Sequence, residues 1–406
     1  MQESFSKIPP YMKSLLIGTL IGLGITAVFA AGFLFRGAID LQRASAASSI
    51  NEYRLLNEVQ ELIDRHYLRQ QPEFKEREYS AIRGMLTTLN DRYTFFVDPP
   101  VAQSESDVLA GTYGGVGVQV KRSENGDLIM YPFVDSPAKS VGIVDGDILV
   151  AINNVVVEVD QQVDAVDQML RGEVKEGNGV ILTFRKSQSQ DEENIFVPFA
   201  VINVPSVIWR TIASHPEFGY IQILIFTSRT PEELKLALQD LLSKDISGLI
   251  LDLRNNSGGL LQESVAVASQ FLDGGIIVYE KSNLTEQELV AEEGGLATYV
   301  PLVVLVNQGT ASAAELVAGA IRDRERGILI GQTTFGKGTV QRIYRLSDES
   351  SLHITSAEWL TPNHLQLEEE GLEPTIAMIP DPNGRDIELG EALRYLEQNY
   401  LQAQGS

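Results

Sequence analysis

The chain has 406 residues, 44% of them hydrophobic, which is enough for sizeable cores in two or three domains. Its 55 acidic and 32 basic side chains give a formal net charge of −23, and such a field repels nucleic acid and anionic lipid. The chain contains no cysteine, which excludes disulfides, thiolate metal sites and cysteine nucleophiles. Because of the negative charge, nucleic-acid binding is not expected.

An uncharged apolar run near the N-terminus predicts a membrane anchor. Residues 15–36 begin LLIGTLIGLGITAVFAAGFLF, which at about 1.5 Å per helical residue is long enough to cross a bilayer. Lys7 and Lys13 precede this run and favour a cytoplasmic N-terminus over residues 1–14, with the rest of the chain on the periplasmic or extracellular face. The small residues at Ala44–Ser48 also allow cleavage of a signal peptide, which would give a secreted protein.

Residues 50–103 have a helical pattern, with apolar residues recurring at helical spacing on both sides of Pro72. Pro99 and Pro100 are expected to close this segment. We expect a small helical cap or a dimerisation arm here, without chemistry of its own. Together with the last helix of the chain, this segment allows a homodimer.

Residues 104–200 change in character to short strands with glycine turns. The stretch GTYGGVGVQV contains Gly115, Val116, Gly117 and Val118 in a loop that continues as a strand. Backbone N–H groups of such a loop can hold a carboxylate, and the strand can pair with an extended peptide. For the glycine cluster alone, a simple hairpin bend is the better interpretation.

The order of this glycine loop, SPAKSVGIVDGDILVAINN, a helix and a further strand resembles a PDZ domain, the module that grips C-terminal peptide tails. The resemblance covers roughly residues 104–200 and implies that residues 115–118 take the carboxylate of the tail. Helical spacing aligns Val163, Val166 and Leu170 on one face. In a PDZ domain part of this face lines the peptide groove, although core packing explains the same spacing.

Residues 201–385 alternate strands and helices, which predicts an open mixed α/β sheet with helices. The almost fully apolar strand at Gly248–Arg254 is typical of a buried parallel sheet. Ligand sites in such sheets lie beyond the carboxyl ends of strands. NNSGGLL at 255–261 and NQGTAS at 307–312 both occupy such positions. Residues 386–406 predict a C-terminal helix that packs on the core.

Ser312 stands where the helix after NQGTA is expected to begin, so its local interpretation is a helix N-cap. Glu315, three residues later, would complete a capping box. The same position suits a nucleophile, because a helix N-terminus directs backbone N–H groups toward developing negative charge. The two roles are compatible.

A serine nucleophile needs a base. Lys337 qualifies only if desolvation lowers its pKa from about 10.4 toward about 7–8. Gln341 lies on the same face in either a strand or a helix, and its neutral amide would orient the amine without raising the pKa of the lysine. Taken alone, Lys337 is better explained as a surface lysine in a turn. The rival is a Ser/His hydrolase with His215 or His353 as the base. None of the four histidines has a convincing acidic neighbour in sequence, which argues against it: His66, His215, His353, His364.

Together, DLRNNSGGLL, NQGTASAAELVAGAIRD and GQTTFGKGTVQ resemble the C-terminal processing peptidases, or tail-specific proteases, which are Ser/Lys endopeptidases with a PDZ domain. The resemblance spans about residues 55–380. It implies that Ser312 is the nucleophile, Lys337 the general base and Gln341 the residue that positions the lysine. It also implies an oxyanion hole, substrates that are proteins or peptides with accessible C-termini, and no cofactor or metal. The oxyanion-hole donors it implies are the backbone N–H groups of Gly258 and Ala313.

The sequence departs from the family pattern at Ser257, where proline is usual, at Thr310, where serine is usual, and within residues 361–378. None of these departures removes a predicted catalytic group. The predicted architecture is multidomain, with an α/β protease core, a PDZ domain, an N-terminal helical segment and one transmembrane helix. A non-catalytic PDZ scaffold that binds tails without turnover is the alternative, and the complete Ser/Lys/Gln set argues against it.

Overall fold

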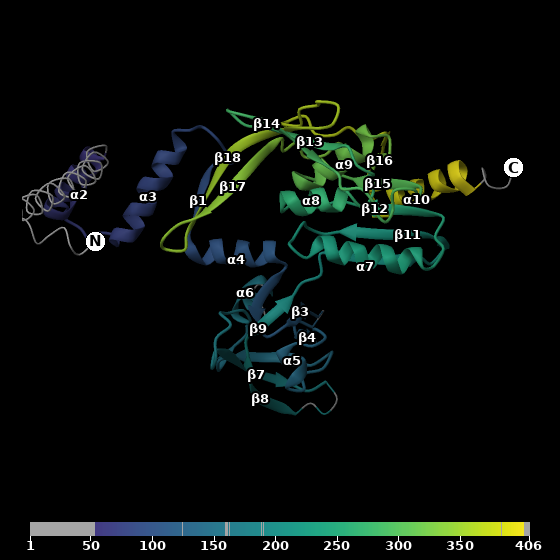
Figure 1. Cartoon of the computed structure of the whole chain (residues 1–406). Coiled ribbons are helices and arrows are strands. Elements are labelled where there is room, and N and C mark those ends of the chain that lie inside the picture. The colour runs from purple at the N-terminus through teal and green to yellow at the C-terminus, as the bar shows by residue number, and fades with distance from the viewer. Residues whose placement is uncertain are drawn as a thin grey trace, which may run out of the picture. The chain divides into compact units, whose positions relative to one another are not determined.

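The computed structural model describes residues 53–401, except 124, 159, 160, 162, 188, 190 and 383 (Figure 1). The chain divides into two compact units, Met1–Ala81 and Ile82–Ser406. The predicted cytoplasmic N-terminus and the predicted membrane anchor, residues 1–14 and 15–36, lie outside the described residues. Within the described part of the chain, no helix is both long and apolar enough to span a membrane.

The first unit contributes α2 (Arg54–His66) and the greater part of α3 (Phe74–Thr87). α2 is amphipathic, yet none of its residues is buried. Its apolar side chains are half or more exposed: Leu55, Leu56, Val59 and Leu62. These helices agree with the helical pattern at the start of residues 50–103.

The chain then differs from the pattern expected up to residue 103, because β1 (Phe95–Val97) is a strand and α4 (Pro99–Ala110) follows it directly. Pro99 and Pro100 begin this helix instead of closing the segment. Proline is well suited to the first helical turn, whose N–H groups have no partner within the helix. α4 therefore crosses the expected boundary at residue 104 and ends at Gly111, whose φ of 70° forms the C-cap.

Antiparallel strands form a separate sheet in the order β3-β4-β5-β7-β8, with β6 beside β5. β7 alternates between buried and partly exposed residues, as expected for a sheet with one face in a core. That core contains Met130, Ile143, Leu182 and Phe184. The elements are β3 (Val118–Arg122), β4 (Leu128–Pro132), α5 (Pro137–Ser140), β5 (Ile148–Ile152), β6 (Val155–Val156), α6 (Val163–Met169), β7 (Gly179–Arg185) and β8 (Glu192–Pro198). A two-stranded ribbon of β2 (Thr112–Gly115) and β9 (Ala200–Asn203) precedes and follows this module in the chain.

The central sheet has the order β10-β11-β12-β15-β16-β19. β10 is antiparallel to β11, and the other neighbours are parallel, which confirms the open mixed sheet predicted for this region. Every residue of β12 and β15 is buried. The strands are β10 (Val207–Ile212), β11 (His215–Ile223), β12 (Gly248–Asp252), β15 (Leu302–Val306), β16 (Ile328–Gly331) and β19 (Ile376–Ala377).

Helices cover both faces of this sheet. Since successive residues of a strand point to opposite faces, neighbouring residues of β12 pack against different helices. Leu249 and Leu251 share a core with α7 (Thr230–Leu242), α8 (Leu261–Ala268) and α9 (Ala313–Asp323). Ile250, between those two leucines, instead packs in a second core with Ala392 and Leu396 of α10 (Ile387–Leu396). A π-helical turn, η2 (Glu397–Leu401), follows α10.

A third sheet, entirely antiparallel, has the order β1-β18-β13-β14, with β17 also paired to β18. β1 therefore joins a strand more than 250 positions later in the chain, with Phe95 opposite His353. β17 and β18 form the long hairpin visible in Figure 1. The strands are β13 (Ile276–Lys281), β14 (Glu286–Val290), β17 (Thr339–Arg345) and β18 (Ser351–Leu360).

Candidate active site

Two loops at the carboxyl ends of β12 and β15 carry the predicted nucleophile and one predicted oxyanion-hole glycine. The strands are parallel neighbours, so their following loops meet at one edge of the sheet. The loops are tied together by hydrogen bonds, because the Asn255 N–H donates to Asn307 Oδ1 at 2.9 Å and Asn307 Nδ2 donates to Asn255 Oδ1 at 3.0 Å. The Ala311 N–H also donates to the Asn256 carbonyl at 2.9 Å.

Ser312 is the N-cap of α9, with φ of 57° and ψ of −121°. Residues with a side chain rarely adopt this conformation, which costs about 1–3 kcal/mol and persists only where surrounding contacts enforce it. Here the Ser312 N–H donates to the Glu315 carboxylate at 2.8 Å, and the Ser312 carbonyl accepts from the Leu316 N–H at 3.0 Å. In α/β-hydrolases a sharp strand-to-helix turn presents the serine nucleophile, and Ser312, the predicted nucleophile here, also lies between a strand and a helix.

Glu315 is fully buried and connects the predicted nucleophile to the predicted base. Its Oε2 accepts from the N–H of Ser312 at 2.8 Å and from the N–H of Lys337 at 3.0 Å. Its Oε1 accepts from the N–H of Gly336 at 2.7 Å and from the Thr334 hydroxyl at 2.5 Å. One carboxylate, a strong acceptor, thus holds the backbone on both sides of the site. The capping interaction expected from the sequence is only one of these four contacts.

Lys337 lies between two glycines that the neighbouring backbone requires. A Cβ at Gly336 would lie 2.9 Å from the backbone nitrogen of Gly371, and one at Gly338 would lie 2.6 Å from that of Glu368. Real Cβ atoms do not approach backbone so closely, and only glycine fits at these positions. Close packing, in addition to the bend expected from the sequence, therefore explains the Gly-Lys-Gly pattern.

The Lys337 Nζ donates a hydrogen bond to Oε1 of Gln341 on β17. The amide of Gln341 is oriented in turn, because its Nε2 donates to the carbonyl of Tyr93 at 2.5 Å. The Tyr93 ring also borders the amine, with its centroid 5.1 Å from Nζ. The Trp359 indole N–H donates to the Lys337 carbonyl at 2.9 Å. The amine is thus held between a neutral amide and an aromatic ring.

Burial lowers the pKa of Lys337 below that of an ordinary lysine, and the carboxylates of Glu368 and Glu315 oppose this shift. Desolvation disfavours the ammonium form, so the proton is lost more readily than from an exposed lysine. A lysine can act as a general base only after losing that proton. The lowered pKa of Lys337 therefore suits a general base, whereas a lysine in an exposed turn would keep its ordinary pKa.

Gly258 packs directly against the serine, since a Cβ there would lie 2.8 Å from the Cβ of Ser312 and 3.2 Å from the backbone nitrogen of Ala313. Its φ of 106° also favours glycine. However, the Gly258 N–H donates to Asn256 Oδ1 at 2.9 Å in this structure. The predicted oxyanion-hole donor is therefore beside the serine, but it is already engaged by an acceptor of its own loop.

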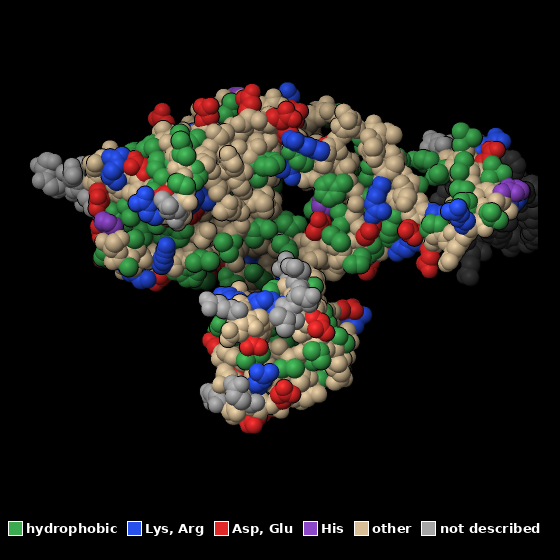
Figure 2. All heavy atoms as spheres, turned by 180° about the vertical axis from the view of Figure 1, so that it is seen from behind, with side chains coloured by type: hydrophobic (Ala, Val, Ile, Leu, Met, Phe, Trp, Pro, Cys, Tyr) green, Lys and Arg blue, Asp and Glu red, His purple; other side chains and the backbone are tan. Residues whose placement is uncertain are grey.

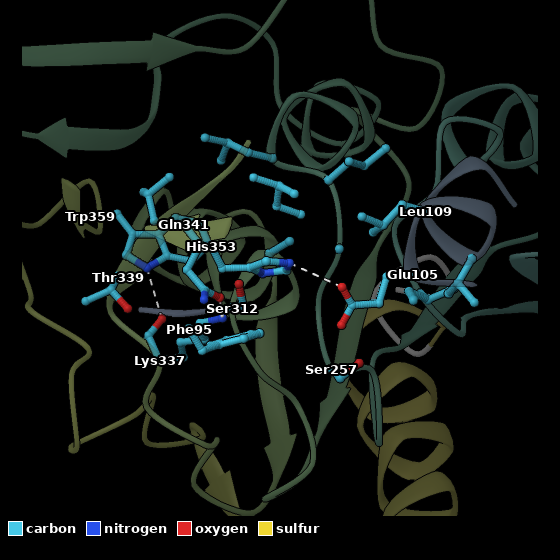
Figure 3. Close-up of a pocket in the computed structure, with 18 of the residues that line it drawn as sticks. Phe95, Glu105, Leu109, Ser257, Ser312, Lys337, Thr339, Gln341, His353 and Trp359 are labelled. Carbon is cyan, nitrogen blue, oxygen red and sulfur yellow. Dashed lines mark hydrogen bonds and ion pairs between the residues drawn. The ribbon is translucent and has the colours of Figure 1, made fainter. Parts of the chain in front are cut away.

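Ser312, Lys337 and Gln341 line one cavity of about 670 Å³ (Figure 3). The remaining walls come from β1, α4, the loops after β11 and β12, the starts of α8 and α9, β17 and β18, and most of the side chains are apolar. They include Phe95, Val101, Val108, Leu109, Ile225, Leu260, Leu261, Val340, Ile343 and Trp359. A cavity of this size and character suits a segment of peptide.

The two histidines considered as alternative bases lie in different places. His353 lines the same cavity as Ser312. His215 lies at the amino end of β11, the opposite end of the sheet from residues 255–260 and 307–312, and its Nδ1 faces Glu217 and Glu397 at 3.4 and 3.2 Å. These three side chains are the one group among the described residues whose ligating atoms could together hold a metal ion. That group is remote from the serine.

One backbone N–H group of the predicted carboxylate-binding loop already has an acceptor in this structure. The Val116 N–H donates to the Leu170 carbonyl at 3.1 Å, and the Gly117 carbonyl accepts from the Phe133 N–H at 2.9 Å. Of the side chains predicted to line the peptide groove, Val166 and Leu170 are fully buried in the core of the module, while Val163 is partly buried against it. Core packing, rather than a peptide groove, accounts for Val166 and Leu170 in this conformation.

Sequence patterns missed several groups around the cavity. Tyr93 and Glu105 come from residues that precede the alternating strands and helices, and no local pattern marks either of them. Tyr93 and Gln341 are 248 positions apart in the chain. The sequence pattern predicts only helix capping for Glu315, and the tertiary structure shows that its carboxylate also binds the backbone of Lys337.

Comparison with known proteins identifies the family of this chain. Residues 217–378 match Peptidase family S41. A carboxy-terminal-processing protease of Bartonella bacilliformis is 33% identical over 323 residues, which cover 77% of this chain and 73% of that protein. The carboxy-terminal processing protease CtpA of Bacillus subtilis is 33% identical over 363 residues, which cover 88% of this chain and 76% of CtpA.

Among solved structures, a candidate S41 protease from Bacteroides fragilis is similar over 82% of this chain and 92% of its own, with a TM-score of 0.50 and 15% identity. At that identity the similarity supports the fold alone. The two relatives from Bartonella bacilliformis and Bacillus subtilis also establish the family, because they match this chain over more than two thirds of both lengths. The chain belongs to peptidase family S41 and is a serine peptidase of the carboxy-terminal-processing group.

Proposed function

We propose that this peptidase cleaves its substrates by a Ser/Lys acyl-enzyme mechanism, with Ser312 as nucleophile and Lys337 as general base. The observation that carries the proposal is the buried Glu315 carboxylate, which binds the backbone N–H groups of both residues. The Lys337 amine is partly buried and is oriented by Gln341. This arrangement supports a nucleophile and a base that are positioned as one unit.

In the proposed reaction, neutral Lys337 takes the Ser312 proton as the Oγ attacks the scissile carbonyl. The resulting ammonium then protonates the leaving amine as the peptide C–N bond breaks, leaving an acyl-enzyme on Ser312. Water, deprotonated by the neutral Lys337, attacks the ester carbonyl. The acyl–Oγ bond then breaks, the Lys337 ammonium returns its proton to the Ser312 Oγ, and the second product leaves as a carboxylate. Gln341 accepts a hydrogen bond from the amine throughout, without adding a charge that would oppose deprotonation.

The oxyanion that forms during attack would be stabilised by the N–H groups of Ala313 and Gly258. Because Gly258 donates to Asn256 Oδ1 in this structure, its N–H must turn away from that acceptor or be shared with the oxyanion. We propose that substrate binding causes this change, since the Gly258 loop packs against Ser312 and would respond to an occupied cavity.

We further propose that the module within residues 104–200 is a PDZ domain that binds the C-terminal carboxylate of the substrate on residues 115–118. The core, residues 201–385, would then cleave the bound chain. The Leu170 carbonyl would have to release the Val116 N–H before a carboxylate could bind there. Residues 15–36 would anchor the enzyme with its catalytic domains outside the cytoplasm, a proposal that rests on the sequence alone.

Blocking the substrate carboxylate is expected to slow cleavage. A peptide with a free C-terminus should be cleaved with a kcat/KM about 10- to 100-fold higher than its C-terminally amidated counterpart, because a hydrogen bond to a charged group contributes about 1.5–3 kcal/mol. The measurement is cleavage of fluorogenic peptide pairs by the full chain. Equal rates would remove tail recognition from the proposal, and binding of the free peptide without turnover would favour the non-catalytic scaffold.

The rate of cleavage is expected to rise with pH, and this rise should follow the deprotonation of Lys337. The base works only when neutral, and burial lowers its pKa below that of an ordinary lysine. kcat/KM should therefore increase from about pH 5 upward and level off below the usual lysine range near pH 10. A pH–rate profile, with the folded state verified at each pH, provides the measurement. A rate that falls steadily over this range would contradict a lysine base.

A further inference from the structure

The cavity that holds Ser312 contains a second pair of ionisable side chains. Among the described residues that line it, the ionisable ones are Lys337, Glu105 and His353. Glu105 comes from α4, which lies outside the family match at residues 217–378, and His353 comes from β18. In a largely apolar cavity a small number of polar groups commonly sets ligand specificity. The pair of Glu105 and His353 is therefore a candidate for this function.

The histidine is fixed, whereas the glutamate borders open space. His353 Nε2 lies 3.2 Å from Glu105 Oε2, and Figure 3 shows the two side chains directed toward each other. The His353 ring stacks on Phe95 with centroids 4.5 Å apart, and its side chain is only 8% exposed. The Glu105 side chain is 39% exposed. The carboxylate therefore has a free side that a ligand entering the cavity can contact.

The charge of this carboxylate is not cancelled by its partner. Burial lowers the pKa of His353, the nearby Lys337 acts in the same direction, and Glu105 opposes both. Since the ordinary pKa of histidine is already about 6.5, the imidazole is mainly neutral at pH 7. A neutral imidazole can donate a hydrogen bond to a carboxylate but supplies no positive charge. The Glu105 carboxylate is thus the group in this cavity that an ammonium or guanidinium group of a ligand would match.

We propose that Glu105 is a specificity-determining residue that binds a lysine or arginine side chain of the substrate, while His353 holds its carboxylate in place. This inference rests on the proposed function, because it assigns a substrate class to the same cavity. The protein as a whole favours a basic segment for a similar reason, since its net charge is −23 and acidic side chains are spread over the face shown in Figure 2. The recognised feature is one basic residue near the scissile bond of an otherwise apolar segment.

A purely structural role for the pair makes a different prediction. If the contact only fastens α4 to β18, then removing either side chain should disturb cleavage of all peptides to the same extent. If the carboxylate binds a substrate cation, Glu105→Gln should remove the preference, whereas His353→Ala should keep most of it, because the charge remains. The two single variants therefore separate the two roles.

The experiment compares peptides that carry lysine or norleucine at each of the three positions on either side of the scissile bond. Norleucine keeps most of the side-chain length but lacks the ammonium group. For at least one position, the wild-type enzyme should show a kcat/KM about tenfold higher with lysine, the size expected for a partly buried charge pair. In Glu105→Gln this ratio should fall to about one. Asp107→Asn is the matched control, since Asp107 lies on the same helix, pairs with Gln103 and does not line the cavity.

The dissociation constants of the lysine and norleucine peptides are also measured in the Ser312→Ala background. The ratio of these constants tests the inference independently of turnover. A lysine preference in binding that Glu105→Gln removes would support the subsite even if no peptide were cleaved, and only the proposed function would then fail. The inference is overturned if wild-type enzyme shows no lysine preference at any position. It is also overturned if Glu105→Gln keeps the preference, or if His353→Ala loses it as completely as Glu105→Gln does.

Discussion

Replacing Lys337 with arginine is expected to lower kcat/KM for peptide cleavage by at least about 10³-fold, as expected when a base essential to a nucleophile is lost. Arginine cannot lose its proton at any working pH, so it cannot take the proton of Ser312. The guanidinium is also wider than an ammonium group, and the Tyr93 ring and the Gln341 amide border the space around Nζ. Ser312→Ala, which removes the nucleophile itself, should show a loss at least as large.

Both variants should still bind the peptide, because neither substitution changes the module that we propose to hold the tail. Fluorescence anisotropy with a labelled peptide measures that binding beside the kinetic assay. Lys244→Arg is the matched control, since Lys244 is exposed and pairs with Asp240 at 2.7 Å, and it should cleave at the wild-type rate. If Lys337→Arg kept more than about a tenth of wild-type activity, Lys337 would not be the base. His353, in the same cavity, would then be the candidate.

Replacing Glu315 with glutamine is expected to lower kcat/KM by at least about 100-fold and to destabilise the protein by about 2–4 kcal/mol. Each carboxylate oxygen accepts two hydrogen bonds, from Ser312 and Lys337 on one side and from Gly336 and Thr334 on the other. The amide of glutamine turns one of these oxygens into a donor, which would face two groups that also donate. The buried N–H groups would lose their partners, and the backbone of Ser312 or of Lys337 would move.

Urea unfolding and kcat/KM, both measured well below the unfolding temperature, test this prediction. Glu370→Gln provides the control, because Glu370 is exposed and the substitution removes the same charge. A purely structural role for Glu315 would appear as reduced stability with an unchanged kcat in the fraction of enzyme that is folded. Wild-type values of both quantities would show that the four hydrogen bonds contribute little.

Much of the catalytic assignment was readable from short stretches of sequence. Ser312 was expected at the start of a helix after a strand, and the structure places it at the N-cap of α9. Gln341 was expected on the face of Lys337, and its side chain binds the Lys337 amine. These features follow from spacing over a few residues, where the local periodicity of a helix or strand decides which side chains are neighbours. The family assignment rests on the same short stretches and is confirmed by the relatives.

The state of the predicted oxyanion hole and of the carboxylate loop was not readable in this way. The Gly258 N–H is engaged by Asn256, and the Val116 N–H by Leu170. A glycine-rich pattern predicts that backbone N–H groups can point toward a ligand. Whether these groups are free to bind it depends on which hydrogen-bond acceptors the tertiary structure places beside them. The role of Pro99 and Pro100 differs from the expectation for a related reason. Two prolines mark a break in many contexts, yet they also suit the first turn of a helix.

The sequence by itself determined the peptidase family, the mixed α/β sheet and the residues most suited to act as nucleophile and base, because each depends on a local pattern of residue types. Only the tertiary structure decided how these residues are held. It joined Ser312 to Lys337 through Glu315, oriented Gln341 through the Tyr93 carbonyl, and brought Glu105 of α4 to His353 in one cavity. These contacts join segments up to 248 positions apart, and at that separation residue spacing carries no information about which groups meet.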